Sequence, residues 1–589
     1  MQSGSSAGTT LSLTPLLDEG SSQLDRPDQQ ELLTVGGIWF AAIMLRFFNL
    51  LAIRDSDPFF RQPSVDPLFY HNWASTIAAG DWLGEGVFLQ GPLYPYLLSL
   101  LYTLTGPNLF TPRFVNCVIG SLVCVLVWHI ARETFGRRTA LVACAISALY
   151  SMFIFYEGSL LIANLLLPLS LLVVGSAVRA MQAPSNSRWL VLGILIGLAA
   201  LARPNMLLYA PLALLMLFGL LRNGFPPSRK SVLAGFLIAG VALTVAPATL
   251  RNYVVTGDPV LITASAGMNF YNGNNPDANG THNVPRIFDR SMADHPLEQN
   301  AIYKAYAEQQ LNKSLDASEV SSFWMGRGID YVREYPGDWL RLVGLKFLYF
   351  INAHEIWNNR SYEVTKQFSW VLRLPLFGFA VVGPLAMLGF VLTARHWRRL
   401  APFYALVVVY LATGLIFFVL SRYRVPAVPV LIVFAAAACV WLYDAVRARR
   451  REFGFALAAL LLFAGISNVE LRGDDLSVAY YNLGNKYRLT SQHEEAIAQY
   501  RKSLEINGGY ISARNNFAIS LEQSGSHREE AIEAWRVLGE MGRERGLDRY
   551  SGKRNRRSAA RRTVKYACAA KHRFLLPEHE SAPSRYGPS

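Results

Sequence analysis

The sequence predicts an all-α membrane protein with about eleven transmembrane helices, interfacial helices on its outer face and a small α-helical repeat domain. Only 17% of the residues are charged, against roughly 25% in soluble domains. Mean hydropathy is positive, at +0.22. The apolar residues gather in repeated blocks of about 16–24 residues, the length that crosses the hydrocarbon layer. A soluble core does not need such blocks, so we expect the chain to cross a membrane many times.

Each long apolar block is a candidate transmembrane helix. Two pairs of blocks lie close together in the sequence. If their boundaries fall elsewhere, the number of spans changes by roughly one or two. A shorter block at 92–104 contains prolines, and we expect an interfacial or re-entrant helix there. The expected spans are 35–53, 114–132, 139–156, 159–180, 189–202, 205–222, 231–249, 372–394, 402–420, 425–445 and 454–470.

Basic residues in short loops predict the orientation of these spans. A basic cluster follows every even-numbered span, as Arg137 and Arg138 follow the second. Because Lys and Arg concentrate in cytoplasmic loops, the N-terminus is predicted to lie in the cytoplasm. The loops 54–113 and 250–370, and everything after residue 470, then lie on the outer side, which we interpret as the periplasmic side of a bacterial cell membrane.

The chain divides into four expected segments. Residues 1–33 are polar and are expected to form a disordered cytoplasmic leader. Residues 34–470 form the membrane domain, residues 477–540 the repeat domain, and residues 541–589 a basic tail. The tail lacks periodicity, so we expect either disorder or an out-of-frame end to a longer helical array.

The net charge of +14, from 56 basic and 42 acidic residues, raises the question of nucleic-acid binding. The tail from residue 541 holds 13 Lys and Arg and four acidic residues, so +9 of the excess lies there. Most other basic residues lie in short loops between spans. This distribution is typical of membrane topology, and we predict no nucleic-acid partner.

The repeat domain carries two copies of the tetratricopeptide pattern, whose period is about 34 residues. Two copies are fewer than such arrays normally need to stand alone. We therefore expect them to lean on the membrane domain or on a protein partner. The pattern consists of Tyr480, Leu483, Gly484, Tyr487, Ala496, Tyr500 and Ser503 in the first copy, and of Phe517, Ala518, Leu521, Ala531, Trp535 and Leu538 in the second.

The first outer loop contains the most informative carboxylate, Asp66. Tyr70, Trp73 and Trp82 follow it with the spacing of a helix that lies at the membrane interface. Asp66 begins this helix and has two interpretations. It is either a helix N-cap, which Asp favours, or a carboxylate that takes a proton from an acceptor hydroxyl at the membrane surface.

Four arginines lie at the outer ends of spans, against the inside-positive bias: Arg203, Arg251, Arg422 and Arg424. A cation there gains little from topology, which predicts a local anionic partner. The guanidinium fork suits phosphate. Phospholipid head groups, or a pairing with Glu157 at the outer turn between the third and fourth spans, remain alternative partners.

Several kinds of catalytic site have no motif in the sequence. It contains no glycine-rich phosphate loop, no Gly-x-Ser-x-Gly elbow and no His/Cys metal cluster. Asp66, Asp81 and Glu157 are candidates for a divalent cation, although nothing requires one. The cytoplasmic loops are too short to build a nucleotide-sugar site. Any activated donor is therefore expected to be carried on a lipid.

Several motifs resemble the integral-membrane glycosyltransferases of the C-type fold. The likeness extends over residues 35–445 and is greatest to the protein mannosyltransferase and aminoarabinose transferase group, which includes bacterial members with tetratricopeptide repeats. It is carried by Asp66, Gly80-Asp81-Trp82, Pro92-Leu93-Tyr94-Pro95, Arg137-Arg138, Ala202-Arg203-Pro204, Arg251-Asn252-Tyr253 and Ser421-Arg422-Tyr423-Arg424.

The resemblance implies transfer of a sugar from a polyprenyl-phosphate donor to an outer-face hydroxyl, with inversion. Asp66 would be the general base, and the outer arginines would bind the departing lipid phosphate. Many relatives have an acidic pair at the first motif, whereas Pro67 follows Asp66 here. Relatives often have Asp or Arg at the turn after the third span. Glu157 occupies that turn, where it would contact the acceptor or orient an arginine.

The remaining candidate residues line the expected substrate site. Two helices, 318–335 and 339–351, are expected in the second outer loop, as a lid or as part of an acceptor site. A transporter or flippase and a non-catalytic scaffold are the alternatives to an enzyme. The polar residues gather at one surface and the chain has no matching halves, which favours the enzyme. The substrate-binding candidates are Tyr70, His71, Asp81, Tyr94, Glu157 and Glu355.

Overall fold

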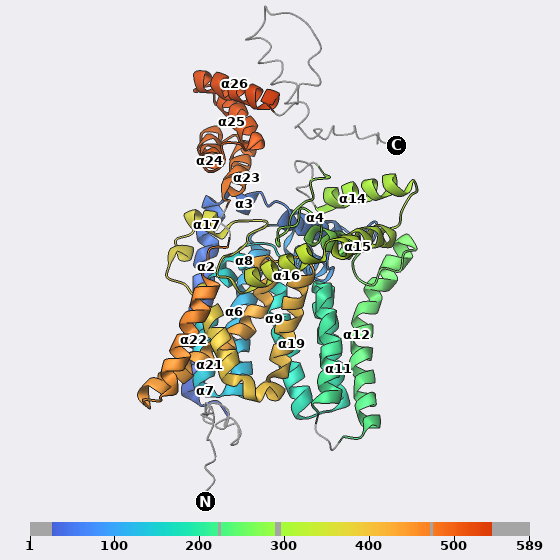
Figure 1. Cartoon of the computed structure of the whole chain (residues 1–589), viewed down its shortest axis with the longest axis vertical. Helices are drawn as coiled ribbons and strands as arrows, with labels where there is room; N and C mark the ends of the chain where they lie inside the picture. Colours follow the sequence, from blue (N-terminus) through green and yellow to red (C-terminus); the bar gives the residue numbers. More distant parts are fainter. Residues whose placement is uncertain (1–25, 222–224, 289–295, 472–474, 545–589) are drawn as a thin grey trace, which may run out of the picture. The chain divides into compact units, whose positions relative to one another are not determined.

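The computed structural model describes residues 26–221, 225–288, 296–471 and 475–544 (Figure 1). The chain divides into two compact units, Met1–Arg472 and Gly473–Ser589. Over the described residues the regular secondary structure is helical, and the single β contact is an isolated bridge between Tyr150 and Phe377. The predicted all-α class is confirmed.

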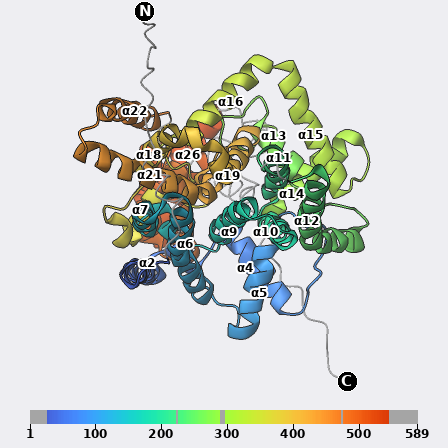
Figure 2. The same ribbon diagram turned by 90° about the horizontal axis from the view of Figure 1, so that it is seen from below.

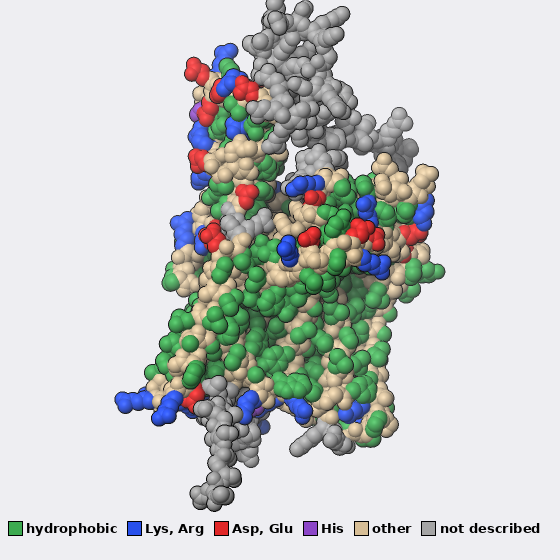
Figure 3. Space-filling view, viewed as in Figure 1, with side chains coloured by type: hydrophobic (Ala, Val, Ile, Leu, Met, Phe, Trp, Pro, Cys, Tyr) green, Lys and Arg blue, Asp and Glu red, His purple; other side chains and the backbone are tan. Residues whose placement is uncertain are grey.

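The first unit, which we call the membrane unit, has within its described residues six helical segments long and apolar enough to cross a membrane. On the face seen in Figure 3, hydrophobic side chains form a broad band over its helices, with Lys and Arg at the edges of the band. The multi-pass membrane character is confirmed. The six segments are α2 (Gln29–Ser56), α6 (Thr111–Phe135), α9 (Ala163–Gln182), α12 (Pro227–Thr256), Phe379–Ile416 and Ser421–Arg447, and three shorter apolar helices are α10 (Asn186–Ala202), Pro204–Gly219 and α22 (Glu452–Ser467).

The third expected span, 139–156, is interrupted in the structure. It consists of α7 (Arg137–Ala148) and α8 (Ser151–Glu157). The amide of Ser151 donates to the carbonyl of Phe377 over 2.9 Å. The break occurs because this bond replaces the next rung of the helical hydrogen-bond ladder.

The eighth and ninth expected spans also differ from the structure. α18 (Phe379–Thr393) begins several residues after position 372, where the span was expected. Leu374 precedes Pro375 and has extended backbone, which keeps a helix from starting there. At its other end α18 continues through a 3₁₀ turn into α19 (Trp397–Ile416), where a loop was expected.

The expected disordered leader ends earlier than residue 33. α2 already begins at Gln29, because Asp28 accepts a hydrogen bond of 2.7 Å from the amide of Glu31 and caps the helix. Glu31 is buried and pairs with Arg132 over 2.8 Å, which ties this helical turn to α6. The rest of the leader, residues 1–25, lies outside the described residues.

The helices expected to lie outside the spans are present. Those of the second loop, α15 (Ala317–Glu334) and α16 (Pro336–Ile351), gather with α4 (Asp66–Ala78) at one end of the spans, together with α14 (Pro296–Leu311), which was not expected (Figure 1). We call this the loop end. α5 (Leu93–Thr105) contacts both α4 and α10 (Figure 2).

The second unit contains the helical repeats. α23 (Ser477–Leu489) pairs with α24 (His493–Ile506), and α25 (Ile511–Ser524) pairs with α26 (Arg528–Glu544). Gly484 lets the Tyr500 ring approach, since a Cβ there would lie 2.6 Å from a ring carbon. The predicted helical repeat region is confirmed. α26 includes residues 541–544 of the expected tail, and residues 545–589 lie outside the described residues.

Candidate active site at the loop end

Asp66 lies in the first turn of α4, directly after a strained residue. Val65 has φ 53° and ψ −127°, a conformation that a β-branched side chain rarely adopts. Such residues cluster at functional sites, where the surrounding structure holds them in place. Val65 occupies the N-cap position and no side chain caps the helix there. Asp66 is therefore not the N-cap that one interpretation of the sequence expected.

Three side chains hold the carboxylate of Asp66. Gln90 donates from Nε2 to Oδ1, and Asn359 donates from Nδ2 to Oδ2, each over 3.1 Å. Arg422 forms an ion pair with Oδ2. Asp66 is only 5% exposed, so these contacts replace most of its hydration.

The balance of these contacts keeps Asp66 ionised. Burial acts to raise the pKa of Asp66, but the charge of Arg422 and the hydrogen bonds from Arg422, Asn359 and Gln90 outweigh it. The pKa of Asp66 therefore lies below its ordinary value of 3.8. At neutral pH Asp66 is therefore a carboxylate, which is the form in which a general base accepts a proton.

A second cation, Arg203, lies next to Arg422. The guanidinium of Arg203 stacks on the ring of Tyr423 at 3.6 Å, and that of Arg422 lies 4.9 Å from the same ring. Nη2 of Arg422 also donates to the Tyr423 hydroxyl over 3.1 Å. Two guanidinium groups therefore share one aromatic ring beside a single carboxylate, which leaves this cluster with an excess of positive charge.

The end of α19, which precedes Arg422 in the chain, is held by a buried lysine that the sequence analysis missed. Lys346 of α16 donates to the carbonyl of Leu415 over 3.2 Å, in the last turn of α19. Its second bond, of 3.1 Å, goes to Asn274, whose amide donates to the carbonyl of Ile416. An ammonium is favoured at a helix C-terminus, where carbonyl groups lack partners. Burial lowers the pKa of Lys346 to about 7.

Arg424 has a different environment from Arg422. It donates to the carbonyl of Phe350 over 3.0 Å and to Glu355 over 2.9 Å, and its guanidinium lies 3.6 Å from the ring of Phe379. Only 2% of its side chain is exposed. Arg424 and Glu355, predicted to bind phosphate and substrate, therefore hold each other within the protein.

Arg251 and Asp81 serve another loop. Arg251 donates to the carbonyls of Leu83 and Gly86 and lies 4.2 Å from the ring of Phe88. Asp81 accepts from the amide of Gly84 over 2.8 Å. No contact within the described residues joins either side chain to Asp66. The structure therefore gives both of them a role in shaping residues 81–88.

The remaining first-loop candidates, Tyr70, His71 and Tyr94, lie on α4 and α5. Tyr70 donates to the side-chain oxygen of Gln90, and its ring meets that of Tyr94 edge to face at 5.3 Å. Burial raises the pKa of Tyr70 well above its usual value. His71 bonds the hydroxyl of Tyr102 over 2.8 Å.

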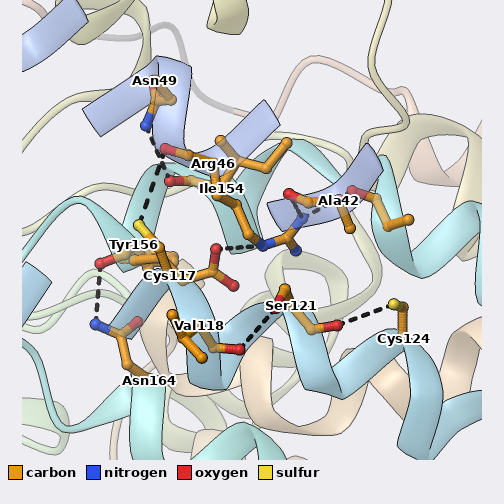
Figure 4. A network of polar contacts seen from close by, with 12 residues as sticks. Ala42, Arg46, Asn49, Cys117, Val118, Ser121, Cys124, Ile154, Tyr156 and Asn164 are labelled. Atoms are coloured by element: carbon orange, nitrogen blue, oxygen red, sulfur yellow. Dashed lines mark hydrogen bonds and ion pairs between the residues drawn. The ribbon is translucent and has the colours of Figure 1, made fainter. Parts of the chain in front are cut away.

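Glu157 does not reach this cluster. It forms an ion pair of 2.6 Å with Arg46 of α2, and neither side chain is more than 1% exposed (Figure 4). A Cβ at Gly120 would lie 2.0 Å from Oε1 of Glu157, so α6 covers the carboxylate. Of the two expected roles of Glu157, the structure supports that of orienting an arginine.

The three cation candidates are not brought together. Within the described residues no group of three or more His, Cys, Asp or Glu side chains is placed to hold a metal ion. Asp66 and Glu157 each pair with an arginine, and Asp81 accepts from a backbone amide. These residues do not fit a divalent cation.

Comparison with known proteins finds two family models, each matching part of the chain. Residues 90–250 match the family model of dolichyl-phosphate-mannose-protein mannosyltransferases, and residues 477–510 match the tetratricopeptide repeat. Over residues 90–250 the match confirms the predicted resemblance to the protein mannosyltransferase group. No curated protein matches the chain.

Solved structures also resemble the chain, at low sequence identity. The oligosaccharyltransferase of Archaeoglobus fulgidus in complex with Zn and sulfate aligns at 16% identity and a TM-score of 0.42, covering 78% of this chain and 56% of that one. ArnT of Cupriavidus metallidurans bound to undecaprenyl phosphate aligns at 14% identity and a TM-score of 0.32, covering 74% and 87%. The chain thus spans little more than half of the archaeal enzyme. These TM-scores are too low to bear on the chemistry.

Proposed function

We propose that the protein transfers a sugar from a polyprenyl-phosphate donor to an acceptor hydroxyl, with inversion at the anomeric carbon. The observation that carries the proposal is the cluster at the loop end. There a buried, ionised Asp66 is paired with Arg422, and Arg203 supplies a second cation beside it. The family match of residues 90–250 supports the same donor class.

In this reaction Asp66 accepts the proton of the acceptor hydroxyl as its oxygen attacks the anomeric carbon. The new bond joins that oxygen to the sugar, and the bond that breaks joins the sugar to the phosphate oxygen. The electron pair of the broken bond stays on the departing polyprenyl phosphate. Arg422 and Arg203 stabilise the negative charge that develops there, in a site with little water.

The proposal revises the expected arginine set. Arg422 and Arg203 remain as phosphate ligands, because their charge exceeds that of the single carboxylate beside them. Arg424 and Arg251 are assigned to structural contacts, since each bonds carbonyl or carboxylate groups of the protein.

The proposal includes the topology. The loop end would be the outer face, the N-terminus would be cytoplasmic, and about eleven spans would connect them. This orientation is consistent with a donor carried on a polyprenyl lipid and presented at the outer leaflet. The repeats would recruit a protein partner on the outer side.

Release of polyprenyl phosphate tests the function. Purified protein is incubated with polyprenyl-phosphate monosaccharides, mannose first, and we expect release by the wild type. Asp66→Asn should slow release about 100–10,000-fold, the usual contribution of a general base. Asp55→Asn is the matched control, because its side chain is 61% exposed and its contacts are to the surface residues Arg54 and Arg61.

Equal rates for wild type and Asp66→Asn across several sugars would overturn the proposal. Movement of labelled lipid across vesicles without release would favour the flippase instead.

A further inference from the structure

Asp66 is held by two amide side chains whose orientations are fixed by chemistry. An ionised carboxylate has only acceptor atoms, so Gln90 and Asn359 must both present their NH₂ groups to it. Gln90 bonds Oδ1 and Asn359 bonds Oδ2, each over 3.1 Å. The amide oxygens of both side chains consequently point away from Asp66.

The two amide oxygens have different surroundings. That of Gln90 accepts a hydrogen bond from Tyr70, which is only 3% exposed. That of Asn359 is buried, and within the described part of the chain no donor bonds it. Leaving a buried acceptor without a donor costs about 1–3 kcal/mol. The hydrogen bonds of the Gln90 amide oxygen are therefore satisfied within the protein, whereas the amide oxygen of Asn359 remains an acceptor without a donor.

Arg422 has a donor atom without an acceptor, the counterpart of the Asn359 oxygen. Its Nη1 pairs with the same Asp66 oxygen that Asn359 bonds, and its Nη2 donates to Tyr423. Its Nε is also buried, with no acceptor among the described residues. An open acceptor and an open donor thus flank one carboxylate oxygen. A glycosyl phosphate offers both partners, since its ring hydroxyls donate and its phosphate oxygens accept.

We infer that Asn359 determines donor specificity by accepting a hydrogen bond from one ring hydroxyl of the transferred sugar. This inference rests on the proposed function. Asn359 then orients Asp66 through its NH₂ group and accepts a hydrogen bond from the sugar through its amide oxygen. A donor that lacks that hydroxyl leaves the amide oxygen unpaired in the bound state, which is how sites built for a hydroxyl reject deoxy analogues.

Deoxy donors test the inference. The probes are polyprenyl-phosphate mannose, or whichever polyprenyl-phosphate hexose is turned over in the release assay, and its monodeoxy analogues. For the wild type, we expect one analogue to lose about 10–100-fold in kcat/KM relative to the parent. For Asn359→Ala, the parent and that analogue should react equally, because the partner of the hydroxyl is gone.

Gln90→Ala is the matched control, since it also removes one hydrogen bond from Asp66. Its overall rate should fall, but the full penalty for the deoxy donor should remain. Affinity for polyprenyl phosphate without a sugar should be the same for Asn359→Ala and wild type, which separates loss of sugar recognition from misfolding. Asn359→Ser serves as a second variant if Asn359→Ala does not fold.

The hydroxyl could belong to the acceptor instead, so the series is repeated with water as the only acceptor. A penalty that disappears in this hydrolysis assay would assign the hydroxyl to the acceptor and overturn the inference. A penalty that persists in Asn359→Ala would overturn it as well. Either result would leave the transferase function intact, whereas absence of release by the wild type would reject the function itself.

Discussion

Two buried carboxylate–arginine pairs in the membrane unit make an instructive comparison. Glu157 and Arg46 are at most 1% exposed, and a Cβ at Gly120 of α6 would lie only 2.0 Å from Oε1 of the carboxylate. The side chains of Asp66 and Arg422 are 7% and 16% exposed and lie between loop segments. The first pair is sealed by helix packing, whereas the second is partly exposed and adjoins the guanidinium of Arg203.

The difference teaches that an ionisable pair is not by itself a sign of chemistry. An arginine within a span is a functional candidate by default because it is costly in hydrocarbon. Arg46 nevertheless has internal partners, since it also donates to the carbonyls of Ala42 and Ala148. What distinguishes the loop end is the second cation, Arg203, and the partial exposure of the Asp66–Arg422 pair, which give a ligand access and a charge to bind.

The largest expected effect is on the stability of the sealed pair. Arg46→Met leaves the carboxylate of Glu157 buried without a counterion, which should destabilise the protein by about 3–5 kcal/mol. Combining it with Glu157→Met should recover most of this loss, because no charge remains to be buried. Thermal unfolding in detergent measures both. A double variant less stable than Arg46→Met would contradict a purely structural pair.

The next effect is on catalysis at the open pair. Arg422→Gln removes a cation from the departing phosphate and should lower kcat about 100–1,000-fold, as loss of one charge-stabilising donor does elsewhere. Arg424→Gln is the neighbouring control, and its main effect should be on thermal stability. Initial rates of polyprenyl phosphate release measure the first. Equal losses of kcat in the two well-folded variants would remove the distinction drawn between these arginines.

A smaller effect concerns Lys346, the buried lysine at the end of α19. The pKa of Lys346 is about 7 in the folded protein, below its ordinary value of 10.5, so between these values the unfolded chain binds more protons. Stability should therefore rise with pH across that window, by at most about 2 kcal/mol between pH 7 and pH 9. Lys346→Met should lack this rise. Unfolding of both proteins at the two pH values measures it, and parallel behaviour would refute the assignment.

The subtlest prediction concerns the acid limb of the pH–rate profile. Arg422 is the main group that lowers the pKa of Asp66 against the effect of burial. Without Arg422 that pKa should rise, so the acid limb of kcat/KM should move to higher pH in Arg422→Gln than in wild type. An unmoved limb would mean that a group other than Asp66 is the base.

The spans and outer helices were predictable because hydrophobic periodicity and interfacial aromatic residues depend on local sequence. Asp66 and Arg422 were also recognisable, as charges at positions that topology does not favour. The sequence did not predict that Arg422 and Arg424 have different partners. Residues two apart on a helix such as α20 (Ser421–Arg424) point to opposite sides, and the sequence does not tell which side faces Asp66. Which of the two arginines faces Asp66 depends on how α20 packs against the rest of the protein.

The amides and the lysine left no comparable signal. Asn359 lies 293 positions from Asp66 along the chain, and Lys346 lies 72 from Asn274. Neutral amides occur throughout loops, and a single lysine in an amphipathic helix usually faces solvent. Only the folded chain shows that Lys346 is fully buried at the end of α19.

The central claim is that the Asp66–Arg422 pair, and not the Glu157–Arg46 pair, performs the chemistry. Single-turnover release of polyprenyl phosphate, compared between Asp66→Asn and Glu157→Gln at equal amounts of folded protein, tests it most directly. The account predicts that Asp66→Asn is slower than wild type by at least about 100-fold, while Glu157→Gln remains within about threefold. A Glu157→Gln enzyme as slow as Asp66→Asn, or an Asp66→Asn enzyme as fast as wild type, would contradict it.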